Sequence, residues 1–183
     1  YGKGKNGEIV RAGGWGHIID DGGSAYSVAR DGFAAIMQSC DGRVKDTMLK
    51  DYYFQKLGIN SPEEIVPFLY NPQTDKGKIA GFAPIVERAA SEGDVVAYDI
   101  IIHNASQLLD LVKAVYSRLN LSSTKVALLG GMISNETIMR LKIIEMIENC
   151  GLDIEYVDAL ADGVSGAVAM ALDAYNEGME CYV

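Results

Sequence analysis

The chain has 183 residues, of which 49% are hydrophobic and 22% charged, and its formal net charge is −9. These values are typical of a soluble globular protein, and they argue against nucleic acid or an anionic membrane surface as the main partner. We see no apolar run near the roughly 20 residues of a membrane span and no signal segment at the start. We therefore expect a cytoplasmic protein with one domain, residues 1–183.

The first part of the sequence predicts a hairpin followed by helices. Asn6-Gly7 lies between short extended runs, a pattern typical of a β-hairpin turn. Ser24 is a suitable N-cap for a helix over 26–39. We expect further helices over 44–57 and from Ser61-Pro62 onward, because proline favours the first turn of a helix. Residues 71–78 are polar and predict a loop.

The second part alternates between helices and strands. We expect long amphipathic helices over 79–91 and 94–120. The apolar stripe of the second comprises Val95, Ile102, Leu109, Val112 and Val115. A strand over 125–129, a helix over 135–149, a strand over 154–157 and a helix over 164–176 follow. This β-α-β-α order predicts an α/β fold with helices on the faces of a sheet.

The three cysteines do not form a recognisable framework. Cys40, Cys150 and Cys181 are far apart, and the sequence contains no CxxC pair. Neither a structural zinc site nor a disulfide framework is indicated. We expect reduced thiols, as in most cytosolic proteins.

The stretch RAGGWGHIIDDGGS, residues 11–24, has two interpretations. Glycine lets a ligand approach the backbone, the ring of Trp15 suits the C–H face of a sugar, and Asp21 can accept hydrogen bonds from neighbouring hydroxyls. This combination indicates a carbohydrate site. Alternatively, Trp15 is a core residue, the glycines form a tight turn, and Asp20 and Asp21 are a solvated cap. His17 alone is more typical of a structural histidine, and no GK[ST] follows to indicate a P-loop.

A second glycine pair ends the strand over 125–129. In open α/β sheets, ligands bind beyond the carboxyl ends of the strands. Gly130 and Gly131 would let a nucleotide lie on the backbone there, and Asn135 could donate a hydrogen bond to it. The alternative is a plain β–α turn, because a glycine pair is nonspecific by itself.

Four stretches together are specific, namely GGWGHIIDDGGSAYSVAR, KIAGFAPIVERAASEGD, ALLGGMI and GVSGAVAMAL. In this order the chain resembles the C-terminal lobe of the N-acetylglucosamine kinase family, which is grouped with the BadF/BadG/BcrA/BcrD ATPases in the actin and sugar-kinase superfamily. The resemblance implies an α/β, ribonuclease H-like lobe, with a mixed sheet, helices on its faces and its first strand missing. Residues 1–183 would then be most of the C-terminal lobe of a two-lobe kinase.

The resemblance also implies site residues. Those implied for the amino sugar are Gly14, Trp15, Gly16 and Asp21, and those implied for adenosine are Ala80, Gly130, Gly131 and Asn135. Two departures from the family pattern affect this assignment. The family's GDEGS reads DDGGS here, so that Gly22 replaces an acid. Asp162-Gly163-Val164-Ser165 stands where a proline usually precedes the last helix.

The activity implied is phosphorylation of the 6-hydroxyl of N-acetylglucosamine or a related amino sugar by ATP with Mg²⁺. This chain would contain no catalytic residue, because the base and the phosphate loop belong to the N-terminal lobe, and its metal ligands are unknown. The implied partners are the amino sugar, the chain's own N-terminal lobe and a second copy in a homodimer. The chain alone would be inactive.

Two other functions stay open. Some BadF relatives are ATPases that activate a dehydratase or reductase, and these hold an iron–sulfur cluster through cysteines. Clustered cysteines are absent from this sequence, whereas the sugar-type GGWGH loop is present. The third function is a non-catalytic amino-sugar sensor, which would keep Trp15 and Asp21 but would need no base.

Overall fold

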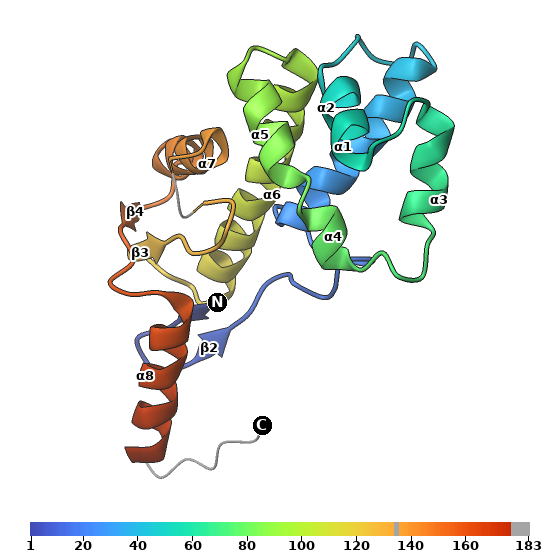
Figure 1. Ribbon diagram of the computed structural model, residues 1–183. Coiled ribbons are helices and arrows are strands. Elements are labelled where there is room, and N and C mark those ends of the chain that lie inside the picture. Colours follow the sequence, from blue (N-terminus) through green and yellow to red (C-terminus); the bar gives the residue numbers. More distant parts are fainter. Residues whose placement is uncertain (134–135, 177–183) are drawn as a thin grey trace.

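The computed structural model describes residues 1–133 and 136–176 (Figure 1). In chain order its elements are β1 (Gly2–Lys3), β2 (Ile9–Val10), α1 (Ala25–Cys40), α2 (Leu49–Leu57), the 3₁₀ helix η1 (Pro62–Glu64), α3 (Ile65–Leu69), α4 (Lys76–Ala80), α5 (Ala83–Ser91), α6 (Val95–Arg118), β3 (Thr124–Ala127), α7 (Ile138–Glu148), β4 (Ile154–Val157) and α8 (Gly163–Asn176). The α/β class is confirmed.

Helices α1 to α5 enclose an aromatic cluster. The ring of Phe33 lies 4.6 Å from that of Tyr53 and 4.9 Å from that of Phe82, and Phe68 completes the group. The Tyr53 hydroxyl is buried and donates to the Ala29 carbonyl at 3.3 Å. Burial raises the pKa of Tyr53, so its hydroxyl remains a neutral donor.

Helix α6 is the central helix and packs against α1, α5 and α7. Its buried apolar residues are Ala97, Ile101, Ala105 and Leu109, one helical turn apart. Of the predicted stripe, Leu109 is buried and Val112 packs partly buried against the core, whereas Val95 is 56% exposed. An 18-residue window of α6 has a mean hydropathy of 1.2, so by length and composition alone α6 is long and apolar enough to cross a membrane, which the sequence analysis did not anticipate. Because one face is buried against three helices, we assign it as a core helix.

The described strands form two pairs and not the expected single mixed sheet. The hairpin is confirmed, since β1 and β2 pair antiparallel with Gly2 opposite Val10. Strands β3 and β4 pair in parallel with Thr124 opposite Ile154. No hydrogen bonds join the two pairs in the described part of the chain, and a cavity of about 350 Å³ lies between β1 and β3.

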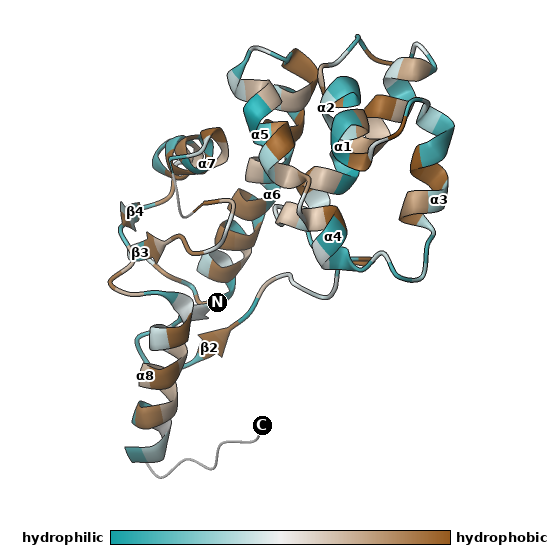
Figure 2. Cartoon of the chain, in the orientation of Figure 1, coloured by the Kyte–Doolittle hydropathy of each residue, from teal (hydrophilic) through white to brown (hydrophobic). Residues whose placement is uncertain are grey.

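Helix α8 lies away from the body of the molecule (Figure 1). All of its side chains that the structure describes are exposed. Apolar residues run along its length (Figure 2), and among them Val164 is 75% exposed and Leu172 56% exposed. The predicted last helix is confirmed, but it has an unusually apolar surface.

Two helix boundaries differ from the predictions for identifiable reasons. Helix α2 begins at Leu49 and not near residue 44, because the Asp94 carboxylate accepts from the Thr47 hydroxyl at 2.7 Å and fixes the preceding chain outside the helix. The helix expected over 79–91 is two helices, α4 and α5. Pro84 lies in the first turn of α5, where its missing N–H costs no hydrogen bond.

Candidate functional site

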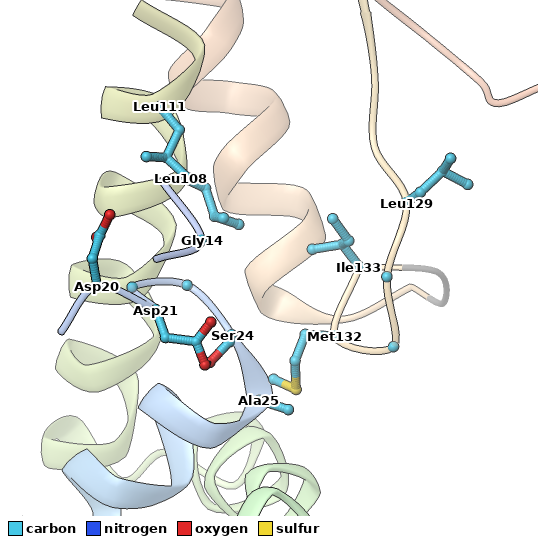
Figure 3. Close-up of a pocket in the computed structure, with 14 residues that line it drawn as sticks. Gly14, Asp20, Asp21, Ser24, Ala25, Leu108, Leu111, Leu129, Met132 and Ile133 are labelled. Carbon is cyan, nitrogen blue, oxygen red and sulfur yellow. The ribbon is translucent and has the colours of Figure 1, made fainter. Parts of the chain in front are cut away.

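One cavity of about 360 Å³ lies between the glycine loop, α6 and the turn after β3 (Figure 3). Its volume is within the range of small-molecule sites. It is lined by Gly14, Asp20, Asp21, Gly22, Gly23, Ser24, Ala25, Leu108, Leu111, Leu129, Gly130, Gly131, Met132 and Ile133. The stretches predicted separately from sequence, around Asp21 and around Gly130, therefore form opposite walls of one cavity.

Asp21 is a carboxylate of the cavity wall whose side chain is held by a neighbouring hydroxyl. It is half-buried, and its Oδ2 accepts from the Ser24 hydroxyl at 2.8 Å. The Ser24 hydroxyl oxygen in turn accepts from the N–H of Ser27 at 3.0 Å, so Ser24 is the predicted N-cap of α1. The start of α1 thus fixes the carboxylate, and Figure 3 shows it on the cavity side of the loop.

Trp15 lies outside the cavity. Its side chain is 68% exposed, so the interpretation as a core residue was wrong. The backbone N–H of Trp15 donates to the Asp20 carbonyl at 3.1 Å, and the Arg11 guanidinium lies 5.2 Å from the centre of the Trp15 ring. Arg11 also donates to the carbonyls of Gly13 and Gly14. Contact of this ring with a sugar remains a prediction.

Several glycines of the loop lie directly on α6. A side chain at Gly22 would come 2.5 Å from Oε1 of Gln107. Gln107 therefore fills the space beside the position where the family carries an acid. Its Oε1 is buried without a hydrogen-bond partner among the described residues. Close packing on α6 is thus a second reason for glycine in this loop, in addition to the ligand approach predicted from the sequence.

The opposite wall is the turn after β3. A side chain at Gly131 would meet no atom of the described residues within 4 Å, so the backbone there is open toward them. The turn is held from behind, because the Thr137 hydroxyl donates to the Met132 carbonyl at 2.7 Å and Arg140 donates to the Ile133 carbonyl at 2.8 Å. Asn135 lies outside the described residues. Sequence reasoning missed Arg140, for which no local pattern was a signal.

The chain matches the model of the BadF/BadG/BcrA/BcrD ATPase family over residues 1–171. It belongs to this family. It is 31% identical over 173 residues to an N-acetylmuramic acid/N-acetylglucosamine kinase of Clostridium acetobutylicum, covering 93% of this chain and 56% of the relative. It is 26% identical over 174 residues to an N-acetyl-D-glucosamine kinase of Dictyostelium discoideum, covering 93% and 54%.

Two solved structures share the fold of this BadF/BadG-family chain. A candidate N-acetylglucosamine kinase of Chromobacterium violaceum has a TM-score of 0.66 at 19% identity, with 91% of this chain and 53% of the other covered. A second candidate, from Porphyromonas gingivalis, has a TM-score of 0.62 at 18% identity, with 92% and 55% covered. The chain spans about half the length of each of these relatives.

One further expectation for this family member concerns Ala80, whereas the metal ligands were left unknown. Ala80 ends α4, which packs against α1, and Ala80 does not line the cavity. Its contact with adenine remains a prediction. Residues 1–133 and 136–176 contain no group of three or more His, Cys, Asp or Glu that could hold a metal ion.

Glu87 joins α5 to the start of α7, and sequence reasoning did not identify it. Its Oε1 accepts from the N–H of Ile138, and its Oε2 is buried without a partner among the described residues. Burial raises the pKa of Glu87, and the N–H groups of Ile138 and Met139 partly offset that effect. The carboxyl group stabilises the helix that follows the Gly130–Ile133 turn.

Proposed function

We propose that the chain is most of the C-terminal lobe of an ATP-dependent amino-sugar kinase, and that it contributes sugar and adenosine contacts. The observation that carries the proposal is the shared cavity, in which Asp21 and Gly14 face the turn of Gly130 and Gly131. Phosphoryl transfer depends mainly on holding two substrates in line. A cavity with one wall for each substrate suits that requirement.

Each wall has a distinct task in this proposal. Asp21 accepts hydrogen bonds from neighbouring sugar hydroxyls and Gly14 offers backbone groups, while Gly16 and the ring of Trp15, which do not line the cavity, would contact the sugar from outside it. Gly130 and Gly131 form the floor for adenosine, and the open backbone at Gly131 fits close approach of a nucleotide. When bound, ATP with Mg²⁺ supplies the phosphoryl group for the 6-hydroxyl of N-acetylglucosamine or a related amino sugar.

The remaining parts are assigned to an N-terminal lobe outside this chain. That lobe would supply the catalytic base, the phosphate loop and the ligands of Mg²⁺. Two features support a larger assembly, namely the cavity between the unjoined strands β1 and β3, which would accept a further strand, and the exposed apolar length of α8. The relatives, nearly twice as long, fit this view. We further propose a cytoplasmic enzyme that forms a homodimer.

The test of function is ADP release by the complete protein with ATP, Mg²⁺ and a panel of amino sugars. We expect release that depends on N-acetylglucosamine, glucosamine or N-acetylmuramic acid. Slow hydrolysis of ATP that ignores every sugar would favour an activator or a sensor instead. An iron signal in the purified protein would then select the activator. The chain of residues 1–183 alone should show no turnover, and robust sugar-dependent release by it would contradict the two-lobe proposal.

Asp21→Ala tests the proposed sugar wall. Loss of hydrogen bonds to a charged group costs about 1.5–3 kcal/mol, or roughly 10- to 150-fold in affinity. We expect the KM for the sugar to rise by that factor and the KM for ATP to stay nearly constant. Asp41→Ala is the matched control, because Asp41 is an exposed carboxylate paired with Arg43. Equal changes in both KM values for Asp21→Ala would refute its assignment to the sugar.

A further inference from the structure

Asn104 of α6 is a fully buried polar side chain with a complete set of partners. Its Oδ1 accepts from the N–H of Gly23 at 3.1 Å. Its Nδ2 donates to the Ile100 carbonyl and to Oδ2 of Asp31, both at 3.0 Å. A buried amide is costly unless its donors and acceptor are paired, so this arrangement is tightly specified. Asn104 therefore connects α6, α1 and the glycine loop at one point.

The Gly23 amide belongs to the turn that carries Asp21. The N–H of Ser24 donates to the Asp21 carbonyl at 3.1 Å, which closes a four-residue turn. Gly23 is the third residue of this turn and has φ +81°, the conformation that such a position requires of glycine. The turn is thus held at the Asp21 side chain by Ser24 and from below by Asn104.

The turn also lies in direct contact with α6. A side chain at Gly23 would overlap Leu108 and come 3.1 Å from the backbone carbonyl of Asn104. The hydrogen bond from Gly23 to Asn104 therefore sets both the height and the orientation of the turn on the helix. Because Asn104 does not line the cavity, its influence on a ligand is indirect, and its hydrogen bond from Gly23 is its direct link to the loop that carries Asp21.

We propose that Asn104 is a positioning residue, which holds the Asp21–Ser24 turn so that the Asp21 carboxylate faces the sugar. This inference rests on the proposed function of Asp21. If Asn104 only stabilised the fold, its replacement would lower the stability of the protein and would change the KM for the sugar and the KM for ATP alike. If Asn104 positions Asp21, its replacement changes the KM for the sugar selectively, because the proposed nucleotide wall at Gly130 and Gly131 belongs to a different segment.

The first experiment compares Asn104→Ala with Leu109→Ala in the complete protein. Asn104→Ala leaves the Gly23 amide buried without its acceptor, and we expect the KM for the sugar to rise about tenfold while that for ATP changes by less than about twofold. Leu109 is buried on the same helix and does not line the cavity. Its truncation should lower thermal stability, as core truncations do, without a selective change in sugar KM.

A second experiment exchanges the two partners. Asn104→Asp keeps an acceptor for Gly23 but brings a carboxylate against Asp31, so the sugar KM should rise. Asp31→Asn in the same protein restores a donor to that carboxylate, and at least about threefold of the lost affinity should return. Recovery is incomplete because the Ile100 carbonyl lacks its side-chain donor. The comparison of Asn104→Asp with the Asn104→Asp/Asp31→Asn double variant also tests the positioning role if Asn104→Ala fails to fold.

Hydrogen exchange at the Gly23 amide gives a readout independent of any ligand. It should be slow in the wild-type protein and much faster in Asn104→Ala. Unchanged exchange would overturn the anchoring, as would equal effects of Asn104→Ala on both KM values or no recovery in the exchanged pair. Absence of sugar binding by the wild-type protein would instead refute the proposed function, and the exchange rate would still report whether Asn104 holds the turn.

Discussion

Replacement of Gly23 by alanine tests whether the glycine loop is held on α6 as the structure indicates. Gly23 is buried with φ +81°, and an added Cβ would overlap Leu108. Two costs follow. A side chain in the left-handed conformation costs about 1–2 kcal/mol, and an extra methyl group in a packed site costs about 1–3 kcal/mol. The expected loss in free energy of unfolding is therefore about 2–5 kcal/mol.

Gly7 provides the matched control for this substitution. It has φ +82°, and nothing lies within 4 Å of an added Cβ. Gly7→Ala therefore has the backbone strain without the overlap, and any stabilisation from a stiffer unfolded chain is similar at both positions. The two variants should therefore differ in their loss of free energy of unfolding by the cost of the overlap alone, about 1–3 kcal/mol.

Chemical denaturation of the complete protein, with sugar binding measured in parallel, is the appropriate assay. We expect Gly23→Ala to lose more stability than Gly7→Ala and to bind the sugar more weakly, because the turn beneath Asp21 must rise from α6. Equal losses of stability in the two variants would show that the loop does not rest on Leu108. That result would also remove the structural basis for an anchored Asp21.

Three further substitutions test other parts of the structure. Burial raises the pKa of Glu87, so folding favours the protonated carboxyl group. The resulting contribution to the free energy of unfolding is fully present below pH 4.5 and is lost as the pH rises through the raised pKa. Glu87→Gln should remove this pH-dependent decline in the free energy of unfolding. Asp94→Ala should cost about 3 kcal/mol, since buried Asp94 caps α6 and accepts from two further donors, whereas exposed Asp75→Ala at α4 should cost about 1 kcal/mol in the same denaturation assay. Gly22→Ala should be destabilising alone and much less so together with Gln107→Ala, and additive effects in that double-mutant cycle would contradict the close contact.

Local sequence signals predicted the order of the elements well. The Asn6-Gly7 hairpin, the Ser24 cap and the strand over 154–157 depend on neighbouring residues, so the sequence contains the information directly. The start of α2 was not predictable in this way. It depends on Asp94, which lies 46 residues from Met48 in the chain and accepts from its N–H.

The candidate site was predictable only in part. The glycine turns and Asp21 could be named from motifs, and the family resemblance predicted that they act together. Asn104 and Glu87 could not, because their partners in the loop and in α7 are 81 and 51 residues away in sequence. An isolated Asn or Glu on an amphipathic helix has no pattern that distinguishes it from a surface residue.

The atoms that surround each glycine indicate whether packing or the approach of a ligand explains the absence of a side chain there. Gly13 and Gly22 lie close to Leu111 and Gln107 of α6, so the fold alone requires small residues at these positions. Gly131 differs, since its φ is not in the left-handed region and an added Cβ would meet nothing within 4 Å. Neither backbone conformation nor packing among the described residues requires glycine there, and the open backbone leaves room for close approach of another molecule. Gly131 lines the same cavity as Asp21, so the open backbone there fits the proposed nucleotide wall beside the proposed sugar wall.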